Sequence, residues 1–190
     1  MQAPTVDRIT GWRYRGHART VALRATWNRA LALVKIRRAR AKDWGKLADA
    51  AGNWHDLANC LAYIEEARRL APQDSEYVMT EAWARTELGI ATQDDAQMER
   101  AWSLWREADA LGNLEAAYEA AIYAAQQKDA KHAAEFLCLA IRDRPDVVTR
   151  LLAADVDEPI VVFLRQVAWN PEVRAALHEA REKTSTPDGA

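Results

Sequence analysis

Apolar residues recur along this chain at the three- and four-residue spacing of amphipathic helices. The first such stripe begins at about residue 18 and consists of Leu23, Trp27, Leu31 and Val34. Arginines and lysines recur among the other positions of this segment, up to residue 42. Because one face of an α-helix recurs about every 3.6 residues, the pattern predicts a helix with one apolar stripe and a basic remainder.

A clear pair of short helices is predicted further along, at residues 114–127 and 130–143. The turn at residues 128–129 separates the two helices, and Pro145 follows the second.

Two similar pairs are predicted before this one, with their boundaries set by cap and turn residues. Gly52 and Asn53 should end the first helix of the first pair, with Asn53 capping the next helix. Gly89 should end the first helix of the second pair in a left-handed conformation, with residues 90–94 as a loop. Thr92 and the carboxylate three residues later should then cap the following helix.

Composition supports an almost entirely helical fold. The 190 residues include only 7 glycines and 6 prolines, too few for the many turns of an all-β protein. The expected organisation has a basic arm and helix, three helix pairs, a set of C-terminal helices and a disordered tail. The basic arm and helix are residues 1–40. The three helix pairs are residues 41–74, 75–113 and 114–147, which together cover 41–147. The C-terminal helices are residues 148–184, including the apolar helix at 159–168, and the tail is residues 185–190.

The residues at the packing positions resemble those of the tetratricopeptide-repeat family. Trp44, Leu47 and Ala48 match the start of its first helix, and Pro145 falls on its closing proline. Counted back from Pro145, the resemblance places Ala121, Ala133 and Ala140 on the small residues at which the two helices of a pair approach closely. The middle pair is also similar to the related SEL-like repeats, through Ala101, Trp105, Ala108, Gly112, Asn113 and Ala116. The resemblance implies a right-handed α-solenoid of about three helix pairs, with a basic N-terminal helix and C-terminal capping helices.

In that family the first helices line a concave groove that binds a partner peptide or helix. Carried over by position, the resemblance assigns to this groove Lys42, Gly45 and Asp49, then Glu76, Met79, Trp83 and Glu87, then Glu115, Tyr118, Ile122 and Gln126. An apolar strip with an acidic rim suits a partner with apolar anchors and positive charge. In the alternative interpretation, Trp83 and Tyr118 pack into the core.

Charge is divided unevenly along the chain. Residues 1–46 contain 12 Lys and Arg against 2 Asp, a net charge of +10, and residues 47–190 have a net charge of −12. The basic arm includes Arg13, Arg15, Arg19, Arg24, Arg29, Arg37, Arg38 and Arg40. Its helix either caps the first pair or docks on an anionic membrane surface or an acidic protein face. Docking in the chain's own groove, or in that of a second copy, is a further hypothesis. The acidic body disfavours nucleic acid.

Catalytic and metal motifs are absent from the sequence, which predicts that the protein is not an enzyme and needs no cofactor or metal. The histidines, His17, His55, His132 and His178, lack the spacing of a zinc site. Asp155, Asp157 and Glu158 favour helix capping over a calcium loop, because the glycine turn and distal glutamate are missing. No glycine-rich phosphate loop or G-x-S-x-G motif occurs.

Compartment is predicted from the cysteines and from the apolar runs. Cys60 and Cys138 are expected to be buried free thiols, which fits a reducing compartment. No signal peptide or membrane-spanning stretch is evident, so a cytoplasmic protein, with peripheral membrane attachment as an alternative, is expected. The sequence therefore predicts a protein-binding adaptor or scaffold. The alternative is a scaffold that uses residues 1–42 on an anionic membrane surface.

Overall fold

The chain is all-helical throughout the residues that the structure describes. The structure is a computed structural model, and it describes residues 27, 28, 30–32, 39–154 and 156–185. Strands are absent from these ranges, and helices dominate them. The all-α prediction is therefore confirmed.

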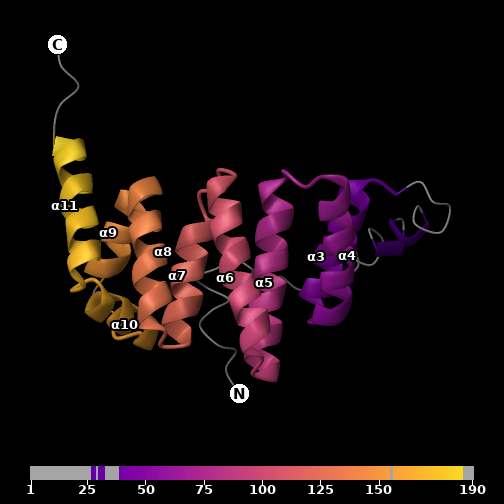
Figure 1. Cartoon of the computed structure of the whole chain (residues 1–190), viewed down its shortest axis with the longest axis horizontal. Coiled ribbons are helices and arrows are strands. Elements are labelled where there is room, and N and C mark those ends of the chain that lie inside the picture. Colours follow the sequence, from indigo (N-terminus) through magenta and orange to yellow (C-terminus); the bar gives the residue numbers. More distant parts are fainter. Residues whose placement is uncertain (1–26, 29, 33–38, 155, 186–190) are drawn as a thin grey trace, which may run out of the picture. The chain divides into compact units, whose positions relative to one another are not determined.

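Nine helices follow one another along residues 39–154 and 156–185, and short connections join them (Figure 1). They are α3 (Ala41–Asn53), α4 (Leu57–Leu70), α5 (Ser75–Thr92), α6 (Asp95–Ala110), α7 (Ala116–Gln126), α8 (Ala130–Asp143), α9 (Pro145–Ala153), α10 (Pro159–Val167) and α11 (Pro171–Ser185). The helices form two compact units, unit 1 up to Ala101 and unit 2 from Trp102 onward.

Unit 1 is built on the α3–α4 hairpin, with α5 packed against α4. Small residues make up much of its core, so the helix backbones come close together. The buried cluster consists of Ala48, Ala51, Cys60, Leu61, Ile64, Ala67 and Ala84, and half-buried aromatic side chains pack around it. Trp44, the tryptophan of the family-like motif, is one of these and lies beside Tyr63.

Within unit 1, the first apolar stripe contacts the α3–α4 hairpin through Trp27. The Trp27 ring lies edge-on to the rings of Trp54 and Tyr63, with centroids 5.0 and 5.6 Å apart. Ala30, one turn further on, is buried. These contacts favour the interpretation in which the stripe packs on the first helix pair. Leu23 and Val34 of the stripe lie outside the described residues.

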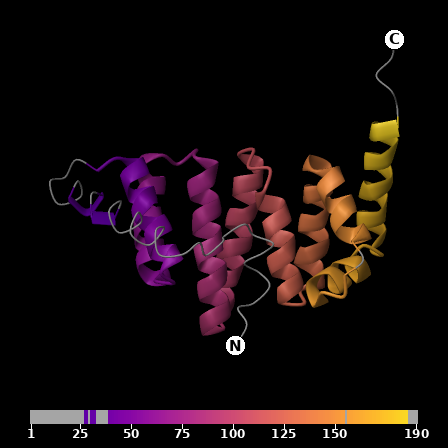
Figure 2. The ribbon, with the colours of Figure 1, turned by 180° about the vertical axis from the view of Figure 1, so that it is seen from behind.

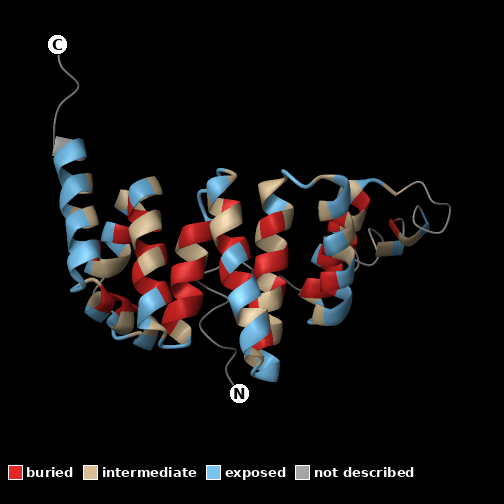
Figure 3. Ribbon diagram, in the orientation of Figure 1, coloured by how far each residue is buried: buried red, intermediate tan, exposed pale blue. Residues whose placement is uncertain are grey.

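Unit 2 is centred on α8. This helix packs against α7 and also contacts α9, α10 and α11, and α10 lies obliquely to its neighbours (Figure 2). Nearly the whole of α7 is buried, whereas α11 is mostly exposed (Figure 3). Large aromatic side chains, Trp102, Trp105, Tyr123 and Phe136, fill the space between the helices.

Several boundaries agree with the sequence prediction. The helix predicted at residues 130–143 is α8, and Asp129 caps it by accepting from the His132 amide. The alanines expected at close helix contacts, Ala121, Ala133 and Ala140, are all buried. Gly112, after α6, has the positive φ of 87° that glycine tolerates best. The apolar helix expected at residues 159–168 is α10, with Val161, Leu164 and Val167 buried.

Other cap predictions are wrong. Asp56, rather than Asn53, caps α4, because its side chain accepts from the Asn59 amide. Helix α10 begins after Glu158 instead of Asp157, without a side-chain cap. Cys60 is buried as expected, but Cys138 is only half-buried; both are free thiols.

The end of α5 differs most from the prediction. The helix continues through Gly89 and the expected loop to Thr92, whose hydroxyl donates to the Leu88 carbonyl. Gln93 then takes the left-handed conformation, and Asp94 caps α6 by accepting from the amides of the next turn. Gly89 is needed for packing instead: a Cβ there would lie 2.8 Å from Sδ and 3.2 Å from the backbone nitrogen of Met98.

Replacing Gly89 with alanine should therefore destabilise the protein. Alanine gains about 1 kcal/mol in helix propensity, but overpacking against Met98 costs about 1–3 kcal/mol. We expect a net loss in the free energy of unfolding, measured by urea denaturation. The cost should shrink in a Met98→Ala background, because much of the crowding is then removed. An increase in stability for Gly89→Ala in the wild-type background would contradict this account.

Candidate functional site

The four predicted groove residues of the second helix pair form one accessible stripe on α5. Met79, Trp83 and Glu87 are half-buried, and Glu76 is exposed. Their spacings of three, four and four residues place them on one side of the helix. The structure thus keeps this part of the predicted set together and open to solvent.

Helix α3 faces this stripe with two glycines. Gly45 and Gly52 lie on one side of α3 because they are seven residues apart. A Cβ on Gly45 would lie 2.8 Å from the Tyr77 ring, and one on Gly52 would lie 2.9 Å from the Trp83 ring. The two α5 rings therefore rest directly on the α3 backbone. Trp83 also packs on the buried cluster of unit 1, so it belongs partly to the core and partly to the surface.

Asp49 lies between these two glycines on the same side of α3. Its side chain is exposed, yet loss of hydration and the nearby negative charge of Glu76 raise its pKa above the ordinary value. Burial and the charges of Asp74, Asp49 and Asp43 likewise raise the pKa of Tyr77. Within the described part of the chain, the Asp49 carboxylate has no ion-pair partner. We call Asp49, Glu76, Met79, Trp83 and Glu87 the α3–α5 face.

The predicted groove residues of the third pair are less accessible. Ile122 is fully buried, so its assignment to an exposed apolar strip is wrong. Tyr118 and Gln126 are half-buried, and Glu115 is exposed and lies 3.6 Å from the Arg144 guanidinium. Ile122 lies on the side of α7 that packs inward. Because α7 is strongly apolar on all sides, the sequence does not show which side that is.

The basic arm falls almost wholly outside the described residues. Arg13, Arg15, Arg19, Arg24, Arg29, Arg37 and Arg38 belong to that undescribed part, and only Arg40 is described. Arg40 is exposed and immediately precedes α3. Its backbone N–H donates to the Asp43 carboxylate at 3.0 Å, so its described role is to begin this helix.

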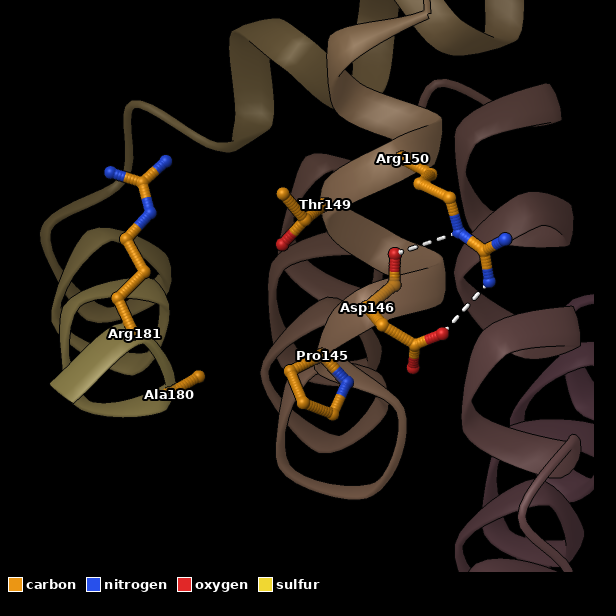
Figure 4. Close-up of a pocket in the computed structure, with 6 residues that line it drawn as sticks. All are labelled: Pro145, Asp146, Thr149, Arg150, Ala180 and Arg181. Atoms are coloured by element: carbon orange, nitrogen blue, oxygen red, sulfur yellow. Dashed lines mark hydrogen bonds and ion pairs between the residues drawn. The ribbon is translucent and has the colours of Figure 1, made fainter. Parts of the chain in front are cut away.

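A large surface hollow of about 550 Å³ lies in unit 2 between α9 and α11 (Figure 4). Pro145, Asp146, Thr149 and Arg150 line one side, and Ala180 and Arg181 line the other. The Arg150 guanidinium donates to the Asp146 carboxylate at 2.8 Å and to its carbonyl oxygen at 3.3 Å. The lining thus offers small apolar groups and an internally paired arginine, with no nucleophile beside a base.

Metal and thiol chemistry find little support in the described ranges. No three His, Cys, Asp or Glu side chains gather there in a way that could hold a metal ion. His132 is buried, stacks on Trp102 and contacts Asp129. Burial raises the pKa of the Cys60 thiol to about 12, so this thiol stays protonated near neutral pH. None of the described helices combines the length and the apolar character needed to cross a membrane.

Glu119, which the sequence did not single out, is the most unusual carboxylate of unit 2. Loss of hydration, together with the neighbouring charge of Glu115, raises its pKa to about 7. It is half-buried on α7, where buried alanines precede and follow it. No motif marks it, because its environment comes from the packing around α7.

Comparison with known proteins adds no relative. No protein-family model matches the chain, and neither a curated protein nor a solved structure shows significant similarity to it. The tetratricopeptide resemblance therefore stays a prediction from the residues themselves.

Glu119 should make the stability of the protein depend on pH. Its pKa is about 7 when folded and about 4.5 in the unfolded chain, so the folded state holds the proton more tightly. The resulting stabilisation is present below about pH 4.5 and is lost as the pH rises through about 7, a change of about 1–3 kcal/mol. Glu119→Gln should remove this dependence in urea unfolding measured across that range. Glu99→Gln, at an exposed position of α6, is the control, and equal pH profiles for the wild type and Glu119→Gln would disprove the effect.

Proposed function

We propose that the protein is a helical-repeat adaptor that binds a cationic, amphipathic peptide or helix on the α3–α5 face. One observation carries the proposal: Asp49 of α3 and Glu76 of α5 crowd each other on an accessible surface beside half-buried Met79 and Trp83. The proposal includes stacking of the helix pairs as in tetratricopeptide repeats. The short connections between α3, α4, α5 and α6 support it.

The carboxylates provide the electrostatic part of recognition. The Asp49 carboxylate has lost hydration and lies near the negative charge of Glu76, so it would gain free energy when a lysine or arginine of a partner comes between the two groups. Glu87 adds a third acidic group to the same stripe. A partner with negative charge would meet repulsion here, so the surface selects by charge sign.

The apolar side chains provide the anchoring part. Met79 and Trp83 are four residues apart on α5, so they present a continuous apolar surface of helix width. Trp83 is held against Gly52 of α3, which limits the side-chain entropy that binding would cost. A partner helix with leucine-like anchors at the same spacing would cover both residues.

The direct test uses a short helical peptide of leucines and lysines, with a twin in which every lysine is glutamate. The lysine peptide should bind the full chain in fluorescence anisotropy, and the glutamate twin should not. The isosteric double substitution Asp49→Asn, Glu76→Gln should weaken binding roughly tenfold, because two favourable charge contacts are lost. Lowering the pH through the raised pKa of Asp49 should weaken wild-type binding as well.

Controls separate recognition from folding. Met79→Ala tests the anchor, and Trp169→Ala is the matched aromatic control, because Trp169 is 74% exposed in unit 2. Thermal unfolding of each variant reports on the fold. Equal affinity for the two peptides, or unchanged affinity in the Asp49→Asn, Glu76→Gln variant, would rule the proposal out.

A further inference from the structure

A second charged feature of unit 1 lies on the opposite side of α5 from the α3–α5 face. It is a hollow of about 350 Å³ lined by Glu65, Arg68, Arg69, Pro72, Glu81, Arg85 and Arg100, which come from α4, α5, α6 and the α4–α5 connection. We call it the arginine hollow. Four arginines against two glutamates give its lining a surplus of two positive charges, although residues 47–190 are strongly acidic as a whole.

Glu81 organises the hollow from beneath. It is only 3% exposed, and its two carboxylate oxygens accept from different arginines. Arg68 Nη1 donates to one oxygen at 2.5 Å, and Arg85 Nε donates to the other at 2.7 Å. A buried carboxylate is stable only when it is paired in this way. The pairing therefore fixes the two guanidinium groups relative to each other.

Arg85 is held by further contacts on the same surface. Its Nη1 donates to the Gln97 side chain at 2.9 Å, and its Nη2 donates to Glu65 at 2.6 Å. The side chains of Arg68 and Arg85 are 16% and 15% exposed, so both reach solvent with little freedom to move. A ligand that meets such fixed donors avoids most of the entropy cost of ordering long side chains.

The rim of the arginine hollow carries positive charge in addition to the two arginines that pair with the buried Glu81 carboxylate. Arg100 of α6 is exposed, and it has no ion-pair partner within the described residues. Arg69 is 66% exposed and pairs with Glu66, which does not line the hollow. Positive groups gathered around one hollow repel each other, and an anion placed among them relieves the repulsion.

We propose that the arginine hollow binds a phosphate monoester. A phosphate monoester carries a charge of about −1.5 to −2 near neutral pH. Among the described residues, Arg100 offers it an unpaired positive charge at the rim, and Arg69 adds a second that is shared with Glu66. Arginine is suited to this group because its planar fork donates two parallel hydrogen bonds to phosphate oxygens. The site is separate from the surface proposed for cationic peptides, and it stands whether or not that proposal holds.

The test uses the full chain with a fluorescein-labelled phosphoserine peptide, its unphosphorylated twin and inorganic phosphate as competitor. The phosphopeptide should bind at least tenfold more tightly than the twin, and inorganic phosphate should displace it. Arg100→Ala and Arg69→Ala should each weaken binding about three- to tenfold. Both side chains are exposed, so the thermal midpoint should stay unchanged.

Two further variants make the result specific. Arg150→Ala removes an exposed arginine of unit 2 and should leave phosphopeptide affinity unchanged. Arg68→Lys keeps the charge but loses the planar fork, and it should weaken phosphopeptide binding. Equal binding of the two peptides, or an effect of Arg150→Ala as large as that of Arg100→Ala, would overturn the proposal. Binding to phosphatidate vesicles without binding to phosphopeptide or inorganic phosphate would overturn it as well.

Discussion

Close approach between helices determines where side chains of this protein can be placed. In unit 1 many of the helix contacts are made by alanine and glycine, and larger side chains fill the space that these residues leave. Gly52 is the clearest example, because the Trp83 ring occupies the volume that a Cβ would need. Gly89 does the same for the Met98 side chain. Packing density is high enough that one methyl group at such a position must displace a neighbour.

The same constraint shapes the surface chemistry of α3 and α5. Since Tyr77 and Trp83 rest on glycines, the two helices lie close enough for Asp49 and Glu76 to affect each other. A larger residue at Gly45 or Gly52 would push the rings away and separate the carboxylates. The crowded charges are therefore a consequence of backbone proximity, and packing in the core determines the electrostatics of the face.

Much of the helical architecture could be predicted from the sequence, because apolar spacing and cap residues are local signals. The helix expected at residues 130–143 forms as α8, after the turn at residues 128–129, and the helix expected at residues 159–168 forms as α10. Gly89 was misassigned because glycine is typical both of helix ends and of close helix contacts, and local sequence does not distinguish the two uses. Ile122 was misassigned because α7 is apolar on nearly every side, so no stripe identifies its accessible side.

The arginine hollow is harder to predict for a different reason. Its members come from three helices and the α4–α5 connection, and the sequence shows only pairs at helical spacing within one helix, such as Glu81 and Arg85 four residues apart. Such a pair ordinarily indicates a solvated surface bridge, whereas here Glu81 is buried. Arg68, thirteen residues earlier and on another helix, donates to the same carboxylate. The Glu81–Arg85 pair is therefore part of a buried network.

Opposite charges on the two sides of α5 have a consequence for partner recognition. One side presents Asp49, Glu76 and Glu87, and the other presents the surplus of guanidinium groups. Their fields decay over about 10 Å in salt, a length similar to a helix diameter, so each side would act on a proposed ligand nearly independently. A partner with separated positive and negative segments could contact both sides only in one orientation. Because each charge cluster includes residues of α5, this helix would link the two and contribute to both the spacing and the polarity of that contact.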